Sequence, residues 1–370
     1  MKVPLFQVKM SSDVDLTDVL QSGYIAQGPK VDELEAELQK FFGNTRCATV
    51  NAGTSAMHLA LRLVRDTCGE RNTVLSIPLT CTATNFPILA NGFDIRWIDT
   101  DPTTCNADVL DMRRKIGPDV AAIVVVHWGG SPCDLEAIRA VQDECERLYG
   151  YRPPLIEDAA HAFGAKWNGK LLGNHNNFVM YSFQAIKHFT TGDGGLLISP
   201  TQDYHKKARL LRWFGLDRDR GPDMRCEQNV SDWGYKFHMN DISAAIGLYN
   251  FETVADVIKK HRLNGYFFDE ALKGIDGITL LNKPTAAEPS YWIYTLRVQD
   301  REAFIKKLAG AGIAASQVHD RNDKHACLSK YKSLLPGTDE VMSDMINIPC
   351  GWWVGEDERQ YIVDTIESGW

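Results

Sequence analysis

The strongest constraint on the fold is an alternation of short apolar runs with helical stretches between residues 73 and 200. Strands that alternate with helices predict a mostly parallel sheet covered by helices on both faces. The run VAAIVVV (120–126) is nearly all apolar, as is typical of a central strand buried on both sides. The strand-like runs are TVLSIPL (73–79), FDIRWIDTD (93–101), VAAIVVVHWGG (120–130), PPLIEDAA (153–160), FVMYSF (178–183) and GGLLISP (194–200).

The length of 370 residues predicts more than one domain. A helix is expected over residues 31–42, where apolar residues recur at helical spacing and Gly43 follows as a stop. After about residue 243 the pattern changes to one long helical segment (244–275), followed by a strand-like run (291–298) and a closing helix (357–370). We therefore predict a large α/β domain over residues 1–245 and a smaller α/β domain over residues 246–370.

The composition argues against several classes of partner. A formal net charge of −8 and a pI near 5.7 disfavour binding to nucleic acid or to an anionic membrane surface. No apolar run approaches the roughly 20 residues that span a bilayer, and the N-terminus MKVPLFQVKMSSD lacks an apolar signal core, so we expect a cytoplasmic protein. Nine cysteines without a C-x-x-C pair, and ten histidines without an H-E-x-x-H array, predict neither disulfides nor a metal site.

The first candidate binding motif is Asn51-Ala-Gly-Thr-Ser55, which lies between a predicted strand and a predicted helix. The free N–H groups at a helix start favour anions, so Thr54 and Ser55 could hold a phosphate. Taken alone, the motif is better explained by Thr or Ser capping the helix. It also lacks the G-x-x-x-x-G-K-[ST] pattern of a nucleotide P-loop.

The second motif is Glu157-Asp158-Ala-Ala-His161, directly after the strand-like PPLI. Acids at a strand end indicate a cationic partner, and an aspartate facing a protonated ring nitrogen fits that need. His161 is close enough in sequence to reach the same ligand. A solvated strand end with a histidine at the edge of the core is an equally good interpretation.

The third motif places Lys187 between YSFQAI (181–186) and HFTTGDGG (188–195). Apolar neighbours can desolvate a lysine, which lowers its pKa and makes the amine nucleophilic enough to form a Schiff base. A single lysine before a turn is more often a surface residue. In chain order, however, the three motifs supply a phosphate anchor, a partner for a pyridinium nitrogen and an imine-forming lysine, which together favour pyridoxal phosphate.

The motifs also resemble those of the DegT/DnrJ-type sugar-nucleotide aminotransferases. The resemblance runs from about residue 3 to the C-terminus, in the same order and spacing. It implies the fold type I of pyridoxal-phosphate enzymes, in which a large domain with a mostly parallel central sheet precedes a smaller C-terminal α/β domain. The segments that carry it are GYIAQGPKVDELE (23–35), NAGTSAMHLAL (51–61), IEDAAHAFGA (156–165), SFQAIKHFTTGDGG (182–195) and GYKFHMNDISAAIG (234–247).

The resemblance implies a role for each matching residue. Lys187 would form the internal aldimine with pyridoxal 5′-phosphate and move a proton between the substrate carbon and the cofactor, with pyridoxamine phosphate as an intermediate. Asp158 would pair with the ring nitrogen and His161 would approach the ring hydroxyl. The remaining implied contacts are Thr54, Ser55 and Ser182 with the phosphate, Ala160 with a ring face, and Tyr24, His319 and His325 with the substrate.

Such enzymes are homodimers with shared sites, and the resemblance implies that Gly234–Lys236 reaches the phosphate of the other subunit. Many relatives have Asn where this chain has Lys236. In the family's P-x-x-T-[aromatic] segment the aromatic residue stacks on the cofactor, whereas this chain has Cys81, so Phe86 is a candidate replacement. His188, next to the lysine, is interpreted as structural.

The function implied is transfer of an amino group from glutamate to a keto-deoxy sugar nucleotide, with a 4-keto-6-deoxyhexose favoured. A 3-keto sugar aminotransferase is the alternative. A pyridoxamine-phosphate-dependent sugar dehydratase of the same fold is disfavoured, because that branch replaces the lysine with histidine. A non-catalytic sensor is disfavoured because Lys187 and Asp158 are both present.

Overall fold

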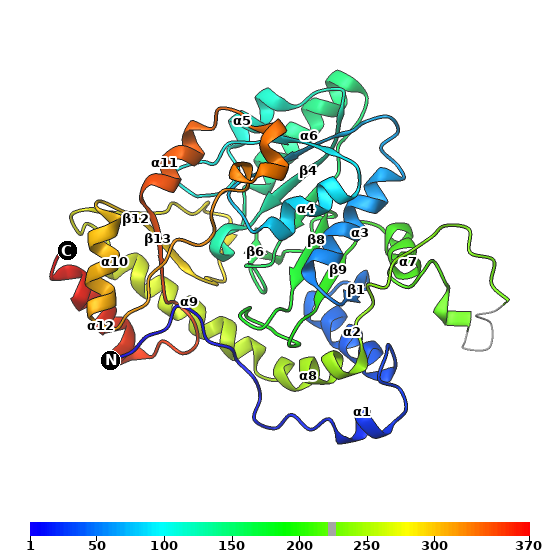
Figure 1. Cartoon of the computed structure of the whole chain (residues 1–370), viewed down its shortest axis with the longest axis horizontal. Helices are drawn as coiled ribbons and strands as arrows, with labels where there is room; N and C mark the ends of the chain where they lie inside the picture. Colours follow the sequence, from blue (N-terminus) through cyan, green and yellow to red (C-terminus); the bar gives the residue numbers. More distant parts are fainter. Residues whose placement is uncertain (221–226) are drawn as a thin grey trace.

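The computed structural model describes residues 1–220 and 227–370, and its centre is a seven-stranded sheet in the order β1-β9-β8-β5-β4-β2-β3 (Figure 1). Strands β3, β2, β4, β5 and β8 are parallel, and β9 runs antiparallel to both β8 and β1. The predicted mostly parallel α/β sheet is confirmed. The strands are β1 (Cys47–Val50), β2 (Thr73–Ser76), β3 (Asp94–Trp97), β4 (Val120–Val126), β5 (Leu155–Asp158), β8 (Phe178–Ser182) and β9 (Gly195–Ile198).

Helices cover both faces of this sheet, and each face has its own buried apolar cluster. Successive residues of β4 alternate between the clusters: Ile123 and Val125 pack with α2 and α6, whereas Ala122 and Val124 pack with α3 and α4. This double burial explains why the strand is a continuous apolar run. The helices of this part are α1 (Thr17–Gln21), α2 (Pro29–Phe42), α3 (Gly53–Arg65), α4 (Thr82–Ala90), α5 (Val109–Lys115), η1 (Trp128–Gly130), α6 (Leu135–Tyr149), α7 (Gln202–Leu211), η2 (Arg218–Arg220) and α8 (Asp241–Phe251).

A second region carries a three-stranded antiparallel sheet, β10-β12-β13, and both chain ends lie beside it (Figure 1). Val3 pairs with Ile313, so the N-terminal segment belongs to this region in space. The elements of this second region are α9 (Val254–Ala271), β10 (Ile278–Leu280), β12 (Tyr294–Val298), α10 (Arg301–Gly310), η4 (Asn322–Lys324), η5 (Ala326–Tyr331), α11 (Pro336–Asp344), β13 (Met345–Ile348) and α12 (Glu356–Glu367). A separate small sheet pairs β6 (Lys166–Trp167) with both β7 (Lys170–Leu171) and β11 (Ala287–Glu288).

The second region also extends over the first. Leu328 and Leu335 are fully buried against the α3 side of the large sheet, although they follow β12 in sequence. The predicted boundary between residues 245 and 246 falls within α8. That division of the chain stays a prediction.

The continuous helix predicted over residues 244–275 is wrong, because α8 ends at Phe251 and α9 begins at Val254. Asn250 is buried at the end of α8, where its side chain donates to the Thr190 carbonyl at 2.8 Å and accepts from the Ser11 N–H at 2.8 Å. The Thr253 N–H and hydroxyl both bond to the Asn250 carbonyl at 3.3 Å. These contacts close the turn between the two helices, and hydropathy alone does not reveal them.

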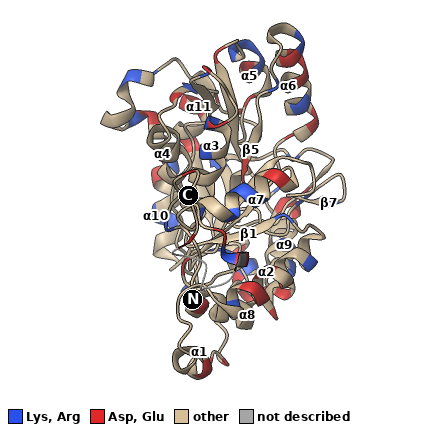
Figure 2. Ribbon diagram, turned by 90° about the vertical axis from the view of Figure 1, so that its right-hand side faces the viewer, with Lys and Arg blue, Asp and Glu red and all other residues tan. Residues whose placement is uncertain are grey.

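Acidic and basic residues are interspersed on the outer helices α5 and α6 (Figure 2). Arg113 of α5 pairs there with Glu144 of α6 at 2.5 Å. Such mixed charge is typical of a solvated surface. Within residues 1–220 and 227–370, every helix is too short or too polar to span a lipid bilayer.

Candidate active site

Lys187 lies in the turn after β8, where it lines a cavity of about 350 Å³ beyond the carboxyl ends of β5 and β8. This is where open α/β sheets bind ligands. Burial lowers the pKa of Lys187 to about 8, while Asp158 and the Cys81 thiol act in the opposite direction. About a tenth of the amine is therefore neutral at pH 7 and about half at pH 8, and the neutral form is the one that a nucleophile requires.

Asp158 ends β5 and faces the same cavity, with only 4% of its surface exposed. Its Oδ2 accepts from the Thr84 hydroxyl at 2.6 Å, and its Oδ1 accepts from the Ala160 N–H at 3.0 Å. Burial raises the pKa of this carboxyl, whereas the two hydrogen bonds and the charge of Lys187 oppose the rise. A cation bound in the cavity would further stabilise the ionised form.

The neighbouring acid, Glu157, takes no part in the cavity. It is fully buried and bonds to His127 Nε2 at 2.8 Å and to the Asn177 amide at 2.7 Å. Alternation along β5 places these two acids on opposite sides of the sheet. Only Asp158 is therefore available to a ligand.

Two histidines add polar atoms to the cavity. His161 and His319 stack in parallel, with ring centroids 5.5 Å apart and planes 12° apart. Burial and the charge of Lys187 hold the pKa of His161 well below its ordinary value and that of His319 at about 4, so both rings are neutral. His161 Nδ1 and His319 Nε2 are buried without a hydrogen-bond partner in the protein, so both atoms are available to a ligand.

At the other end of the cavity the first turn of α3 faces Ser182. The N-cap residue is Ala52, and no side chain caps the helix. The capping role considered for Thr54 and Ser55 is thus wrong: Thr54 lines the cavity, and Ser55 donates to the Asn51 side chain at 2.7 Å. A helix start whose N–H groups are uncapped and face a cavity is suited to a phosphate.

Glycine makes this arrangement possible. A Cβ atom on Gly53 would lie 2.9 Å from Ser182 Cβ, and one on Gly195 would lie 2.6 Å from the Gly53 nitrogen. The helix start and the ends of β8 and β9 are therefore in closer contact than any side chain allows.

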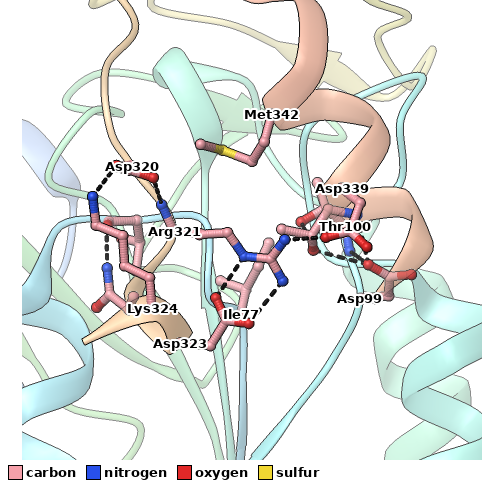
Figure 3. A network of polar contacts seen from close by, with 12 residues as sticks. Ile77, Asp99, Thr100, Asp320, Arg321, Asp323, Lys324, Asp339 and Met342 are labelled. Atoms are coloured by element: carbon pink, nitrogen blue, oxygen red, sulfur yellow. Dashed lines mark hydrogen bonds and ion pairs between the residues drawn. The ribbon is translucent and has the colours of Figure 1, made fainter. Parts of the chain in front are cut away.

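The segment that carries His319 is fixed to the strand ends by a polar network (Figure 3). Arg321 donates to both oxygens of Asp323, at 2.6 and 2.7 Å, and also pairs with Asp339 of α11. Next to it, the Asn322 amide donates to the Thr80 carbonyl at 2.6 Å and its oxygen accepts from Asn85 at 3.0 Å. The segment that follows His319 is thus fixed to the turn between β2 and α4 and to the first residues of α4.

The structure brings together most, but not all, of the residues singled out in the sequence. Ser55, Tyr24, His325 and Lys236 do not line the cavity: Tyr24 is 65% exposed, and the His325 ring faces Phe86 at 6.3 Å. The Lys236 carbonyl accepts from Asn51 at 3.4 Å, beside the cavity. The sequence-predicted residues that line it are Thr54, Cys81, Asp158, Ala160, His161, Ser182, Lys187 and His319.

Sequence reasoning missed Trp292, Gln184 and Asp193, which also line the cavity, and Thr84, which supports Asp158. Trp292 lies in the run at 291–298, for which the sequence predicts only a strand. Gln184 and Asp193 flank Lys187 within the motif 182–195, so their closeness to Lys187 in sequence could have identified them as candidate site residues. In the described part of the chain, no group of three His, Cys, Asp or Glu residues is arranged to hold a metal ion.

Comparison with known proteins gives a consistent result. The profile of the DegT/DnrJ/EryC1/StrS aminotransferase family matches residues 8–367. The structure is similar to that of AtS13 from Actinomadura melliaura, with 46% identity, coverage of 100% of this chain and 99% of that chain, and a TM-score of 0.97. It is also similar to the sugar aminotransferase CalS13 from Micromonospora echinospora, with 45% identity, full coverage of both chains and a TM-score of 0.94.

A relative of known reaction is more distant. The UDP-4-amino-4,6-dideoxy-N-acetyl-beta-L-altrosamine transaminase of Campylobacter jejuni is 27% identical over 371 residues, which is 96% of this chain and 94% of the relative.

Proposed function

Because the chain belongs to the DegT/DnrJ/EryC1/StrS aminotransferase family, we propose that it moves an amino group from glutamate to a keto-deoxy sugar nucleotide with pyridoxal phosphate as cofactor. The observation that carries this proposal is one cavity lined by both a lysine with a lowered pKa and a buried aspartate.

The residues present fit pyridoxal phosphate. Asp158 would hold the protonated ring nitrogen, and the unpartnered His161 Nδ1 would meet the ring hydroxyl. The start of α3 at Thr54, together with Ser182, would hold the phosphate. Ala160 would contact one ring face. When bound, the cofactor supplies an electron sink for the carbon that loses its proton.

Each residue then has a definite task. Lys187 Nζ, in its neutral form, would hold the cofactor and would carry the proton that the substrate carbon loses. The Asp158 carboxylate would stabilise a proton on the ring nitrogen and so would keep the ring electron-poor. Ile186 and Met180 give the cavity apolar walls that exclude water and keep the amine reactive.

The preference for a 4-keto sugar is part of the proposal. The Campylobacter relative is named for a 4-amino-4,6-dideoxy sugar nucleotide, which supports amination at C4. His319, whose Nε2 lacks a partner, is the proposed polar contact to the substrate from this subunit. Tyr24 and His325, outside the cavity lining, would contact substrate only at its entrance.

We also propose a cytoplasmic homodimer in which Gly234–Lys236 reaches the phosphate of the other subunit. Large apolar side chains are exposed at Tyr24 (65%) and Trp233 (63%), and Phe214 is 44% exposed. Such exposure is typical of a surface that another chain covers. Light scattering at micromolar concentration should give twice the monomer mass of 41.5 kDa.

The decisive experiment adds pyridoxal phosphate and sodium borohydride to the purified protein and locates the trapped cofactor by mass spectrometry. It should be found on Lys187. Lys187→Ala should lose both the adduct and all turnover with glutamate, whereas Lys170→Ala, on the exposed strand β7, should retain both. Full activity in Lys187→Ala would refute the proposal.

The substrate is tested with glutamate and a panel of 3-keto and 4-keto sugar nucleotides. Mass spectrometry should find an amino sugar, and NMR should place its nitrogen at C4. Nitrogen at C3 would favour the 3-keto alternative, and a deoxygenated product would indicate a dehydratase.

A further inference from the structure

The amine of Lys187 lies over an aromatic face that the sequence did not associate with it. Its Nζ is 3.8 Å from the ring centroid of Trp292, and Trp292 is 2% exposed. At this distance the negative face of an indole attracts a cation, and burial strengthens the attraction because little water competes. Trp292 precedes β12, in the second region of the chain.

The indole is fixed to the lysine's own segment. Trp292 Nε1 donates to the carbonyl of Ile186 at 2.9 Å. On the other side of the lysine, His188 Nε2 bonds to the carbonyl of Ser290 at 2.9 Å. Since a carbonyl only accepts, His188 is the donor. Hydrogen bonds on both sides of Lys187 therefore tie residues 186–188 to residues 290–292.

The ring is also held by stacking. His161 stacks on Trp292 with centroids 3.9 Å apart and planes 13° apart, and Phe6 stacks on it at 4.9 Å and 26°. A further buried histidine, His261, bonds through Nδ1 to the Tyr291 carbonyl at 2.8 Å. Trp292 is thus prevented from tilting, and its position relative to Lys187 is over-determined.

We propose that Trp292 is a positioning residue, whose indole face holds the ε-ammonium group of Lys187 in the cavity whenever the amine is not bound to the cofactor. A free lysine side chain has four rotatable bonds and would otherwise occupy many positions. Transamination requires the lysine to leave the cofactor and return, and this part of the inference rests on the proposed function.

Several other groups face the same amine and influence its charge. Asp158 at the end of β5 and Cys81 at the start of α4 favour the charged form, and burial opposes it. The neutral rings of His161 and His319 face it from the loop after β5 and from the segment before η4. A substitution that changed the size of Trp292 would also move these groups relative to Lys187. A change in the pKa of Lys187 can therefore be attributed to the indole face only if the ring keeps its size and shape.

The test therefore weakens the indole face without changing its size. Tryptophan fluorinated on the six-membered ring is placed at position 292, and the same residue is placed at Trp128 as a control. Trp128 is equally buried and presents its edge to His161 at 6.1 Å and 79°. The pKa of Lys187 is measured in the full-length, cofactor-free protein from the pH dependence of its reaction with acetic anhydride, by mass spectrometry of the Lys187 peptide.

The pKa should fall by about one pH unit for the substitution at 292, because a desolvated cation–π contact has about that effect on the charged form. The substitution at 128 should leave it unchanged. An unchanged or raised pKa at 292, or an equal fall in both proteins, would overturn the inference. Borohydride trapping on the unaltered protein tests the proposed function separately, since a failure there leaves this titration intact.

Discussion

Thr84 is the residue through which the electrostatics of the site can be changed most cleanly. Its hydroxyl donates to Asp158 Oδ2 at 2.6 Å, and both residues are buried, with 0% and 4% of their surfaces exposed. Because Thr84 has one hydroxyl proton and gives it to Asp158, the Thr80 hydroxyl, 2.8 Å away, must donate to Thr84. Thr84→Val keeps the shape of the side chain and removes this donor.

The size of the effect of Thr84→Val follows from the negative charge of the Asp158 carboxylate that accepts the hydrogen bond. A hydrogen bond to a buried carboxylate contributes roughly 1.5–3 kcal/mol. Its loss would raise the pKa of Asp158 by about one to two pH units, since one unit corresponds to about 1.4 kcal/mol. The ionised form that pairs with the cofactor ring would become less available. We expect the Kd for pyridoxal phosphate to rise about 10-fold to 100-fold.

Absorbance titration of the cofactor-free protein with pyridoxal phosphate measures this Kd directly. Thr84→Ser retains the hydroxyl and should bind within about twofold of the unaltered protein, whereas Thr80→Val removes only the second donor and should have an intermediate effect. If Thr84→Val bound the cofactor as tightly as Thr84→Ser, Asp158 would not depend on this hydrogen bond, and the proposed role of the carboxylate would need revision.

Three further predictions concern single residues. With the pKa of Lys187 at about 8, the neutral fraction and thus the rate of combination with pyridoxal phosphate should rise about fivefold from pH 7 to pH 8 and level off above about pH 9. The raised pKa of Asp158 means that its ionisation opposes folding at every pH above the unfolded value of 3.8, so Asp158→Asn should raise the Tm of the cofactor-free protein at pH 7 while abolishing turnover. Cys81→Phe places an aromatic ring where relatives have one, and should lower the Kd for pyridoxamine phosphate about threefold to tenfold.

Each of these has an outcome that contradicts it. A rate that rises about tenfold from pH 7 to pH 8 and keeps rising above pH 9 would show that the amine has the ordinary lysine pKa and is not desolvated. A lower Tm for Asp158→Asn at pH 7 would show that the carboxylate is stabilising even without a ligand. Cys327→Phe, at another exposed thiol, is the control for Cys81→Phe. If Cys81→Phe left the Kd for pyridoxamine phosphate unchanged, residue 81 would not lie against the face of the cofactor ring.

How far the sequence predicts this molecule depends on which contacts are local. The strand at 120–126 and the helix that ends before Gly43 follow from periodicity and from a glycine that adopts φ of +62°. Thr54, Asp158 and Lys187 could be placed together because carboxyl ends of neighbouring strands meet at one edge of a sheet. Their roles, by contrast, came from the family resemblance and from chemistry.

What could not be predicted depends on contacts between distant segments. Trp292 is held beside Lys187 by contacts that include the bond from His188 to Ser290, and the segment of His319 is held by contacts that include the bond from Asn322 to Thr80. No periodicity or spacing encodes such pairs, which are separated by more than 100 residues. Ser55 was misplaced for the opposite reason, since a bond to its near neighbour Asn51 satisfies it.

The segments at 290–292 and 318–322, laid across the strand ends, have a consequence for unfolding. A molecule bound in the cavity touches the main sheet and both segments together, so its binding energy is linked to the folding of the whole chain. Saturation with cofactor should merge the melting of the two regions into one cooperative transition. Without it, the second region can open first and take Trp292 and His319 with it, which would leave Lys187 exposed to solvent before the main sheet unfolds.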